Sequence, residues 1–156
     1  MTTEMPDEET ALRVARERPT TARHEAGHAV AAVHYGCPIE NVSIEGQWPA
    51  LGTTRLGVSR AIDAIVIFCG PLAERSWNEF QPGADMKFET VGSDQEILLY
   101  LIQNLPLTSD ECSVLVQEAI TFLSKPAVQA QIDAVTEALL AQGKLTTDEL
   151  RGIVGI

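Results

Sequence analysis

Two histidines and a glutamate near the start of the chain have the spacing of a metal site. His24, Glu25 and His28 form the pattern H-E-x-x-H. Residues four apart on a helix project from one face, so both imidazoles could reach a single Zn²⁺ ion. Glu25, beside the first histidine, could take a proton from a water molecule and return it to a leaving amine. The pattern predicts one zinc ion per chain, with Glu25 as the general base.

A catalytic zinc takes three protein ligands and leaves the fourth position open, so one further donor is needed. His34 lies six residues after His28, well around the helix, and the three cysteines form no cluster. A carboxylate is therefore the expected third ligand. Asp94 is the leading candidate because the Ser93/Glu96 capping box places it in the first turn of a helix. An aspartate at this position is also common without any metal, because its negative charge interacts favourably with the helix dipole. The alternatives are Asp85, Glu89 and Glu74.

The composition predicts one globular domain of acidic character. The chain has 156 residues, 45% of them hydrophobic, and a net charge of −11. This charge disfavours nucleic acid as a partner. The longest apolar run, 61–70, is interrupted by Asp63 and falls short of the ~20 residues of a membrane span. With no secretory signal and unclustered cysteines, we expect a cytoplasmic protein with reduced thiols.

The elements around the motif are predicted from breakers and apolar spacing. A short helix over 8–18 should stop at Pro19, so that 1–18 forms an acidic lead and 19–156 the domain. A second helix runs from Thr20 or Thr21 to residue 34 or 35, with Gly36 able to adopt the left-handed conformation.

Strands over 39–45 and 53–58 should form a hairpin or small sheet. Ser59 could cap an apolar helix through Phe80, kinked or split at Gly70-Pro71 and followed by a loop over 81–92. Further helices are expected near 94–104, 109–124, 126–141 and 147–154, with capping boxes at Ser93/Glu96, Thr108/Glu111 and Thr146/Glu149. The fold class is mostly α (α+β), a helical bundle with a small hairpin or sheet beside the H-E-x-x-H helix.

The order of several segments resembles the peptidase domain of the FtsH family, membrane-bound AAA+ zinc proteases. The segments are HEAGHAVAAVHYG, VSIE, LGTT, GPLAE, GSD and IDAVTEALLAQGKLTTDEL, which together span about 20–154. The resemblance implies His24, His28 and Asp94 as zinc ligands and Glu25 as the base. It also suggests a role for Glu74 behind the ligands or in helix packing. Because such proteases hold substrate as an added β-strand, Val42, Ser43, Ile44 and Glu45 are the candidate substrate edge.

The sequence departs from the family in ways that affect its function. It contains no ATPase module and no phosphate-binding loop, Gly-Pro-Leu replaces Gly-Gly-Arg at 70–72, and the segment before Asp94 differs. We therefore expect an ATP-independent zinc metallopeptidase acting on peptides or unfolded segments. The sequence does not determine whether the chain forms a homo-oligomer, or whether Fe²⁺, Co²⁺ or Ni²⁺ can replace zinc. The alternatives are a binding or regulatory module whose catalysis has lapsed, and a helical domain without metal.

Overall fold

The fold is mostly helical, as expected. The computed structural model describes residues 8–45, 52–77 and 93–155, which form six helices and a sheet of three strands. In chain order these elements are α1 (Glu8–Tyr35), β1 (Ile39–Ser43), β2 (Thr53–Leu56), α2 (Asp63–Trp77), α3 (Ser93–Asn104), α4 (Ser109–Leu123), α5 (Pro126–Gln142), β3 (Lys144–Thr146) and α6 (Thr147–Val154).

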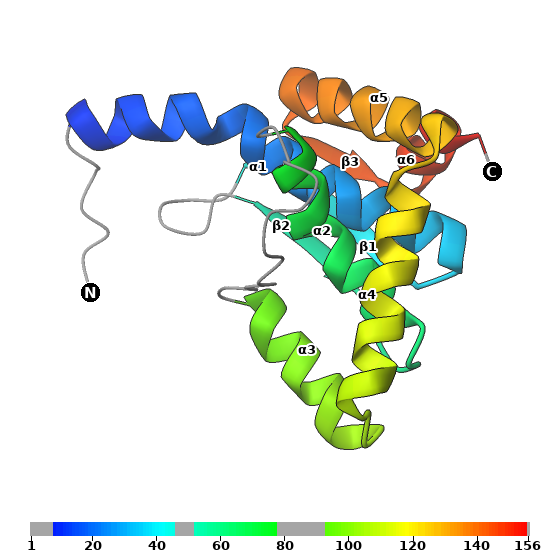
Figure 1. Ribbon diagram of the computed structural model, residues 1–156. Coiled ribbons are helices and arrows are strands. Elements are labelled where there is room, and N and C mark those ends of the chain that lie inside the picture. The colour runs from blue at the N-terminus through cyan, green and yellow to red at the C-terminus, as the bar shows by residue number, and fades with distance from the viewer. Residues whose placement is uncertain (1–7, 46–51, 78–92, 156) are drawn as a thin grey trace.

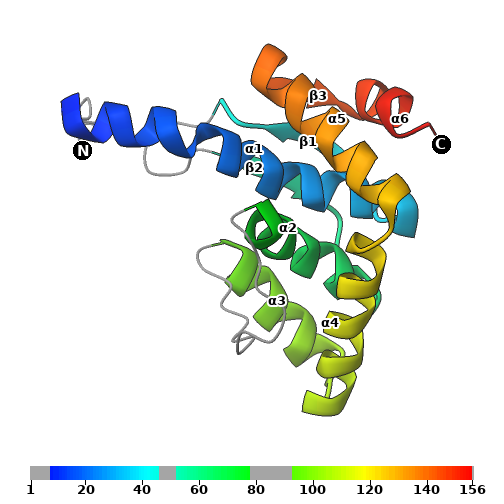
Figure 2. The same ribbon diagram turned by 45° about the horizontal axis from the view of Figure 1, so that its top comes forward.

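Helix α1 is the central element of the structure. It packs against α2 on one side and α5 on another, while α3 and α4 pack against α2 (Figures 1 and 2). The buried face of α1 consists mainly of small residues: Ala22, Ala26, Ala29, Val30, Ala31 and Ala32. Small side chains allow the neighbouring backbones to approach closely. A Cβ atom at Gly27 would lie only 2.4 Å from the Cys69 carbonyl oxygen of α2.

Helix α2 forms much of the hydrophobic core. Seven consecutive residues, 64–70, are buried. Among them Ile65 and Ile67 are almost fully removed from solvent, and burial of such a side chain stabilises the fold by about 1.5–3 kcal/mol. This helix therefore gives the side chains of α1 a rigid neighbour.

Neither Pro19 nor Pro71 ends a helix, although the sequence predicted a stop at Pro19 and a kink or split at Gly70-Pro71. Helix α1 continues through Pro19, so the predicted helix boundary is wrong, and the proposed division at 18/19 falls inside α1. Helix α2 likewise continues through Pro71. A proline removes one N–H donor but keeps a helical φ, so flanking helical turns held by packing can continue across it. Near Pro19, Arg18 donates a hydrogen bond to the Leu140 carbonyl of α5.

The start of α2 also differs from the prediction. The helix begins at Asp63, not directly after Ser59. The Asp63 carboxylate accepts hydrogen bonds from the backbone amides of Ser59 and Arg60, at 2.9 and 2.8 Å, and from the Arg60 guanidinium. These contacts of an acidic side chain hold the turn that leads into the helix, where we expected a cap from the Ser59 hydroxyl. The predicted continuation to Phe80 and the loop over 81–92 lie outside the described residues.

The expected hairpin is present and gains a third strand. β1 pairs antiparallel with β2 on one side and with β3 on the other, giving the order β2-β1-β3. Val42, at the centre of the sheet, lies opposite Thr54 and Leu145 and is fully buried. β3 lies about a hundred residues after β1 in the chain, so the segment between Gly143 and α6 adds the third strand from a distant part of the sequence.

The helix ends in the C-terminal part follow the predicted signals. The capping boxes at Thr108/Glu111 and Thr146/Glu149 are both formed. Gly143 ends α5 with φ 80°, and Gly36 follows α1 with φ 68°, both in the left-handed region that favours glycine. The side chains of the Ser93/Glu96 box lie outside the described residues. No helix among the described residues has the length and apolarity that a membrane crossing requires.

Candidate metal centre

His24, Glu25 and His28 lie together on α1, where it faces α2 and β2. One ligand atom from each of the three lies within 4.8 Å of the others, and no other such group of three occurs among residues 8–45, 52–77 and 93–155. The one-turn spacing of the motif accounts for this proximity. The surrounding elements determine which way each side chain points.

The His28 ring is buried and held by α2. It is 1% exposed, and its Nδ1 lies 2.9 Å from the carbonyl oxygen of Val66. A carbonyl only accepts hydrogen bonds, so Nδ1 carries the proton and Nε2 keeps its lone pair. Gly70 makes room for the ring, because a Cβ atom there would lie 2.3 Å from Nε2.

The His24 ring is held by a carboxylate. Its Nδ1 lies 2.9 Å from Oε2 of Glu74, near the end of α2. The side chains are 25% and 37% exposed, respectively, so this part of the site reaches the surface. An ionised carboxylate accepts a hydrogen bond from Nδ1–H, which leaves Nε2 unprotonated in the neutral ring. Glu74 thus contacts His24 on the nitrogen opposite the one that a metal would use, and it does not occupy the position of a third ligand.

The two Nε2 atoms face each other at a distance of 3.2 Å. With both Nδ1 atoms donating to α2, two lone pairs meet across this gap, an arrangement that is unfavourable unless a proton or a cation lies between them. Two nitrogens at 2.0–2.1 Å from a tetrahedral zinc ion are separated by about 3.3 Å. The residues present therefore fit a zinc ion.

Glu25 points toward the start of β2. Glu25 is only 5% exposed, and the Thr54 hydroxyl donates a hydrogen bond of 3.3 Å to its Oε1. A Cβ atom at Gly52 would lie 2.9 Å from Cγ of Glu25, so the chain entering β2 passes close to the carboxylate. The carboxylate is thereby confined beside the two imidazoles.

No protein-family model matches this chain, and no curated protein matches its sequence. The assignment of the metal centre therefore rests on the geometry of α1 and its neighbours. Several of the contacts that define this geometry, among them those of the Val66 carbonyl and the Thr54 hydroxyl, are absent from the predictions. Every residue has a backbone carbonyl, so the sequence does not indicate which one contacts a histidine ring. A threonine in a strand is too common to indicate a site.

The predicted third ligand remains a prediction. Asp94 lies in the first turn of α3, which packs against α2, and its side chain is outside the described residues. Asp85 and Glu89 are also outside them. His34, which we did not expect to bind metal, lies 2.6 Å from the side-chain oxygen of Gln131 on α5. It stands nearly three helical turns from His24.

The expected substrate edge over 42–45 is not an open strand edge at Val42 and Ser43. Val42 and Ser43 pair with residues of β2 on one side and of β3 on the other. The Ile44 amide donates to the Gly143 carbonyl, and the Glu45 amide to the Ser43 hydroxyl. The late strand β3 occupies the edge that the hairpin alone would have left open. Among the described strands, the outer edge near Glu25 belongs to β2.

The buried thiols are not reactive groups. Burial raises the pKa of Cys69, and burial together with the nearby Asp63 charge raises the pKa of Cys37 to about 11. Both thiols therefore remain protonated near neutral pH and are poor nucleophiles.

Burial opposes ionisation of Asp63, but hydrogen bonds from Arg60 and from the Ser59 and Arg60 amides outweigh the effect of burial and hold the pKa of Asp63 below its ordinary value.

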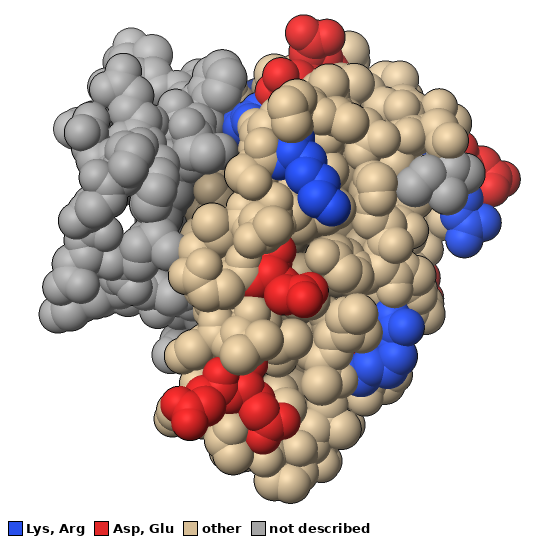
Figure 3. All heavy atoms as spheres, turned by 45° about the vertical axis from the view of Figure 1, so that its right-hand side comes forward, with Lys and Arg blue, Asp and Glu red and all other residues tan. Residues whose placement is uncertain are grey.

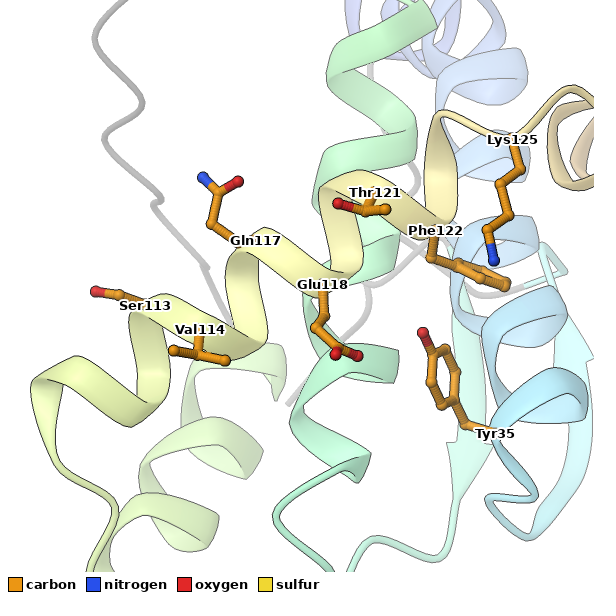
Figure 4. Close-up of a pocket in the computed structure, with 8 residues that line it drawn as sticks. All are labelled: Tyr35, Ser113, Val114, Gln117, Glu118, Thr121, Phe122 and Lys125. Carbon is orange, nitrogen blue, oxygen red and sulfur yellow. The ribbon is translucent and has the colours of Figure 1, made fainter.

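A separate groove of about 510 Å³ lies along α4. One face of α4 lines it together with Tyr35 and Lys125, and the rings of Tyr35 and Phe122 meet edge-on at 5.2 Å (Figure 4). Tyr35 follows His24 by eleven residues on α1, which corresponds to about 16 Å along the axis. The surface on this side carries acidic and basic side chains separated by wide uncharged areas (Figure 3). The groove is thus distinct from the metal centre.

Proposed function

We propose that this protein is a zinc-dependent metallopeptidase that hydrolyses peptide bonds in peptides or unfolded segments. The observation that carries the proposal is the pair of Nε2 atoms 3.2 Å apart, each on a ring whose Nδ1 is held by an acceptor of α2. Zinc ligation by histidine commonly has this form, in which a carboxylate or carbonyl fixes the ring from behind. The resemblance of the sequence to the FtsH peptidase domain supports the same assignment.

In this proposal His24 and His28 hold the metal, and Asp94 supplies the third ligand. A zinc ion bound there would lower the pKa of a water molecule toward about 7 and polarise the scissile carbonyl. Glu25 accepts the proton of the attacking water and returns it to the leaving amine. The Thr54 hydroxyl, 3.3 Å from Oε1, keeps the Glu25 carboxylate turned toward β2, where the substrate would lie.

The outer edge of β2 supports a peptide as the substrate. β2 pairs with β1 on one side, and among the described residues no strand pairs with its other side. An extended peptide added to this edge would gain main-chain hydrogen bonds independent of its sequence. The Thr54–Glu25 contact supports this choice, because it brings β2 close to the proposed general base. We therefore propose β2, and not β1, as the strand that receives the substrate.

The experiment that tests the function compares the parent with Glu25→Gln, which keeps the shape of the side chain but cannot accept a proton. We expect both proteins to hold one zinc per chain by elemental analysis. Cleavage of an unstructured reporter peptide should fall by roughly 10²–10⁴-fold in Glu25→Gln. Glu40→Gln, a change at an exposed glutamate of β1, is the matched control and should retain the parent's rate.

Two results would contradict the proposal. Equal cleavage by the parent and Glu25→Gln would remove Glu25 as the base. A parent that holds one zinc per chain yet cleaves no peptide of a diverse library would favour the alternative of a binding or regulatory module that retains the metal.

A further inference from the structure

Arg23, the residue before the motif, is a charged group buried among three helices. Its side chain is 6% exposed. Its Nη1 pairs with the Asp133 carboxylate and its Nη2 donates to the side-chain oxygen of Gln129 at 2.6 Å, both on α5. Its Nε donates to the Ala73 carbonyl of α2 at 3.3 Å. A buried guanidinium is tolerated only when its donors are paired, so these contacts require α1, α2 and α5 to keep their relative positions.

Two neighbouring residues of α1 thus contact two neighbouring residues of α2. Arg23 donates a hydrogen bond to the Ala73 carbonyl. His24, which follows Arg23 in α1, bonds the carboxylate of Glu74, which follows Ala73 in α2. Both α2 residues lie near the end of that helix at Trp77. The end of a helix opens more readily than its centre unless tertiary contacts hold it. Arg23 is the described side chain that joins this end of α2 to both α1 and α5.

We propose that Arg23 is a positioning residue for His24. By fixing the end of α2, it sets the Glu74 carboxylate against Nδ1 of His24, which keeps the proton on Nδ1 and turns Nε2 toward His28. The inference rests on the proposed function insofar as it takes His24 as a zinc ligand. The effect on the His24 ring itself, however, is a property of the metal-free protein.

The first measurement is the tautomer of His24 in the metal-free protein, read by long-range ¹H–¹⁵N NMR above the ordinary histidine pKa. The parent should show the Nδ1-protonated form. Arg23→Met should show a mixture of both tautomers. Arg18→Met is the matched control, because Arg18 lies on the same helix and also bonds a carbonyl of α5, that of Leu140, at 3.1 Å. Its His24 signal should equal that of the parent.

The second measurement is the dissociation constant for Zn²⁺. Loss of a group behind a histidine ligand weakens metal binding by roughly 10–100-fold, so we expect about tenfold for Arg23→Met and no change for Arg18→Met. Because Arg23 acts through Glu74, the double variant Arg23→Met/Glu74→Gln should bind Zn²⁺ no more weakly than Glu74→Gln alone. Arg23→Lys should not restore binding, because one ammonium cannot reproduce the three-way contact of the guanidinium.

If Arg23→Met does not fold by circular dichroism, the pair Gln129→Ala/Asp133→Asn replaces it. This pair keeps Arg23 but removes its partners on α5, and it should also mix the His24 tautomers. A folded Arg23→Met or Gln129→Ala/Asp133→Asn protein with the parent's tautomer would overturn the proposal. Additive losses of Zn²⁺ affinity in the double variant would do the same.

The failure of this proposal is distinguishable from failure of the proposed function. A parent that binds no Zn²⁺ refutes the metallopeptidase, while the tautomer comparison in the metal-free protein still tests the role of Arg23. Conversely, a parent that binds zinc and cleaves peptides, with a His24 ring unaffected by Arg23→Met, refutes only the positioning role.

Discussion

Gly70 and His28 fit against each other without space for a side chain between them. A Cβ atom at Gly70 would lie 2.3 Å from Nε2, 2.4 Å from Cε1 and 2.7 Å from Cδ2 of the His28 ring. These are distances that non-bonded atoms do not adopt. Since the His28 ring is 1% exposed and also held by the Val66 carbonyl, it has little freedom to move aside.

Gly70→Ala should therefore destabilise the fold and abolish stoichiometric zinc. Forcing a methyl group into a packed interior costs about 1–3 kcal/mol. The control is Gly152→Ala in α6, where a Cβ atom would meet nothing within 4 Å; replacing a helical glycine there should be neutral or stabilise by up to about 1 kcal/mol. Urea unfolding and elemental analysis measure both effects. A Gly70→Ala protein with the parent's stability and zinc content would show that the ring does not occupy this position.

The third ligand has a direct test in Asp94. Asp94→Asn keeps the size of the side chain but removes its charge, so the metal centre would lose an anionic donor. We expect zinc content after dialysis to fall well below one per chain, while Asp110→Asn, in the first turn of α4, should retain the metal. Full retention of zinc in Asp94→Asn would move the third ligand to another carboxylate, with Asp85 and Glu89 the next to substitute.

Acid stability should depend on Asp63. Its pKa is lowered in the folded protein from the ordinary value of 3.8, because the hydrogen bonds it accepts outweigh the effect of burial. Its contribution to the free energy of unfolding is therefore fully present above about pH 3.8 and is lost as the pH falls through the folded pKa. The melting temperature of Asp63→Asn should be well below the parent's near neutral pH, and the gap should narrow below about pH 3.8. A gap that stays constant across this range would show that the Asp63 charge does not stabilise the fold.

The parts of the fold with local signals could be predicted from the sequence. A threonine followed three residues later by a glutamate satisfies two helix amides at once, and the starts of α4 and α6 lie where Thr108 and Thr146 predicted them. The spacing of His24 and His28 is equally local, because four residues make about one turn. Such features need no knowledge of distant segments.

The remaining features depend on contacts between distant segments. A proline costs a helix one hydrogen bond wherever the helix continues across it, so the local sequence favoured a break, yet α1 and α2 run through Pro19 and Pro71. β3 covers the edge of β1 from a position about a hundred residues away, so no pattern near Val42 indicated it. The orientation of the rings depends on Glu74 and on the Val66 carbonyl, which only the packing of α1 against α2 brings to them.

The central claim is that the Nε2 atoms of His24 and His28 hold one divalent cation. The most direct measurement is titration of the metal-free, ¹⁵N-labelled protein with Zn²⁺, following the ring nitrogens of all three histidines by NMR. We predict that the Nε2 signals of His24 and His28 shift together and saturate at one equivalent while their Nδ1 atoms stay protonated, and that His34 is unaffected. Signals of His24 and His28 that remain unchanged beyond one equivalent would contradict the account.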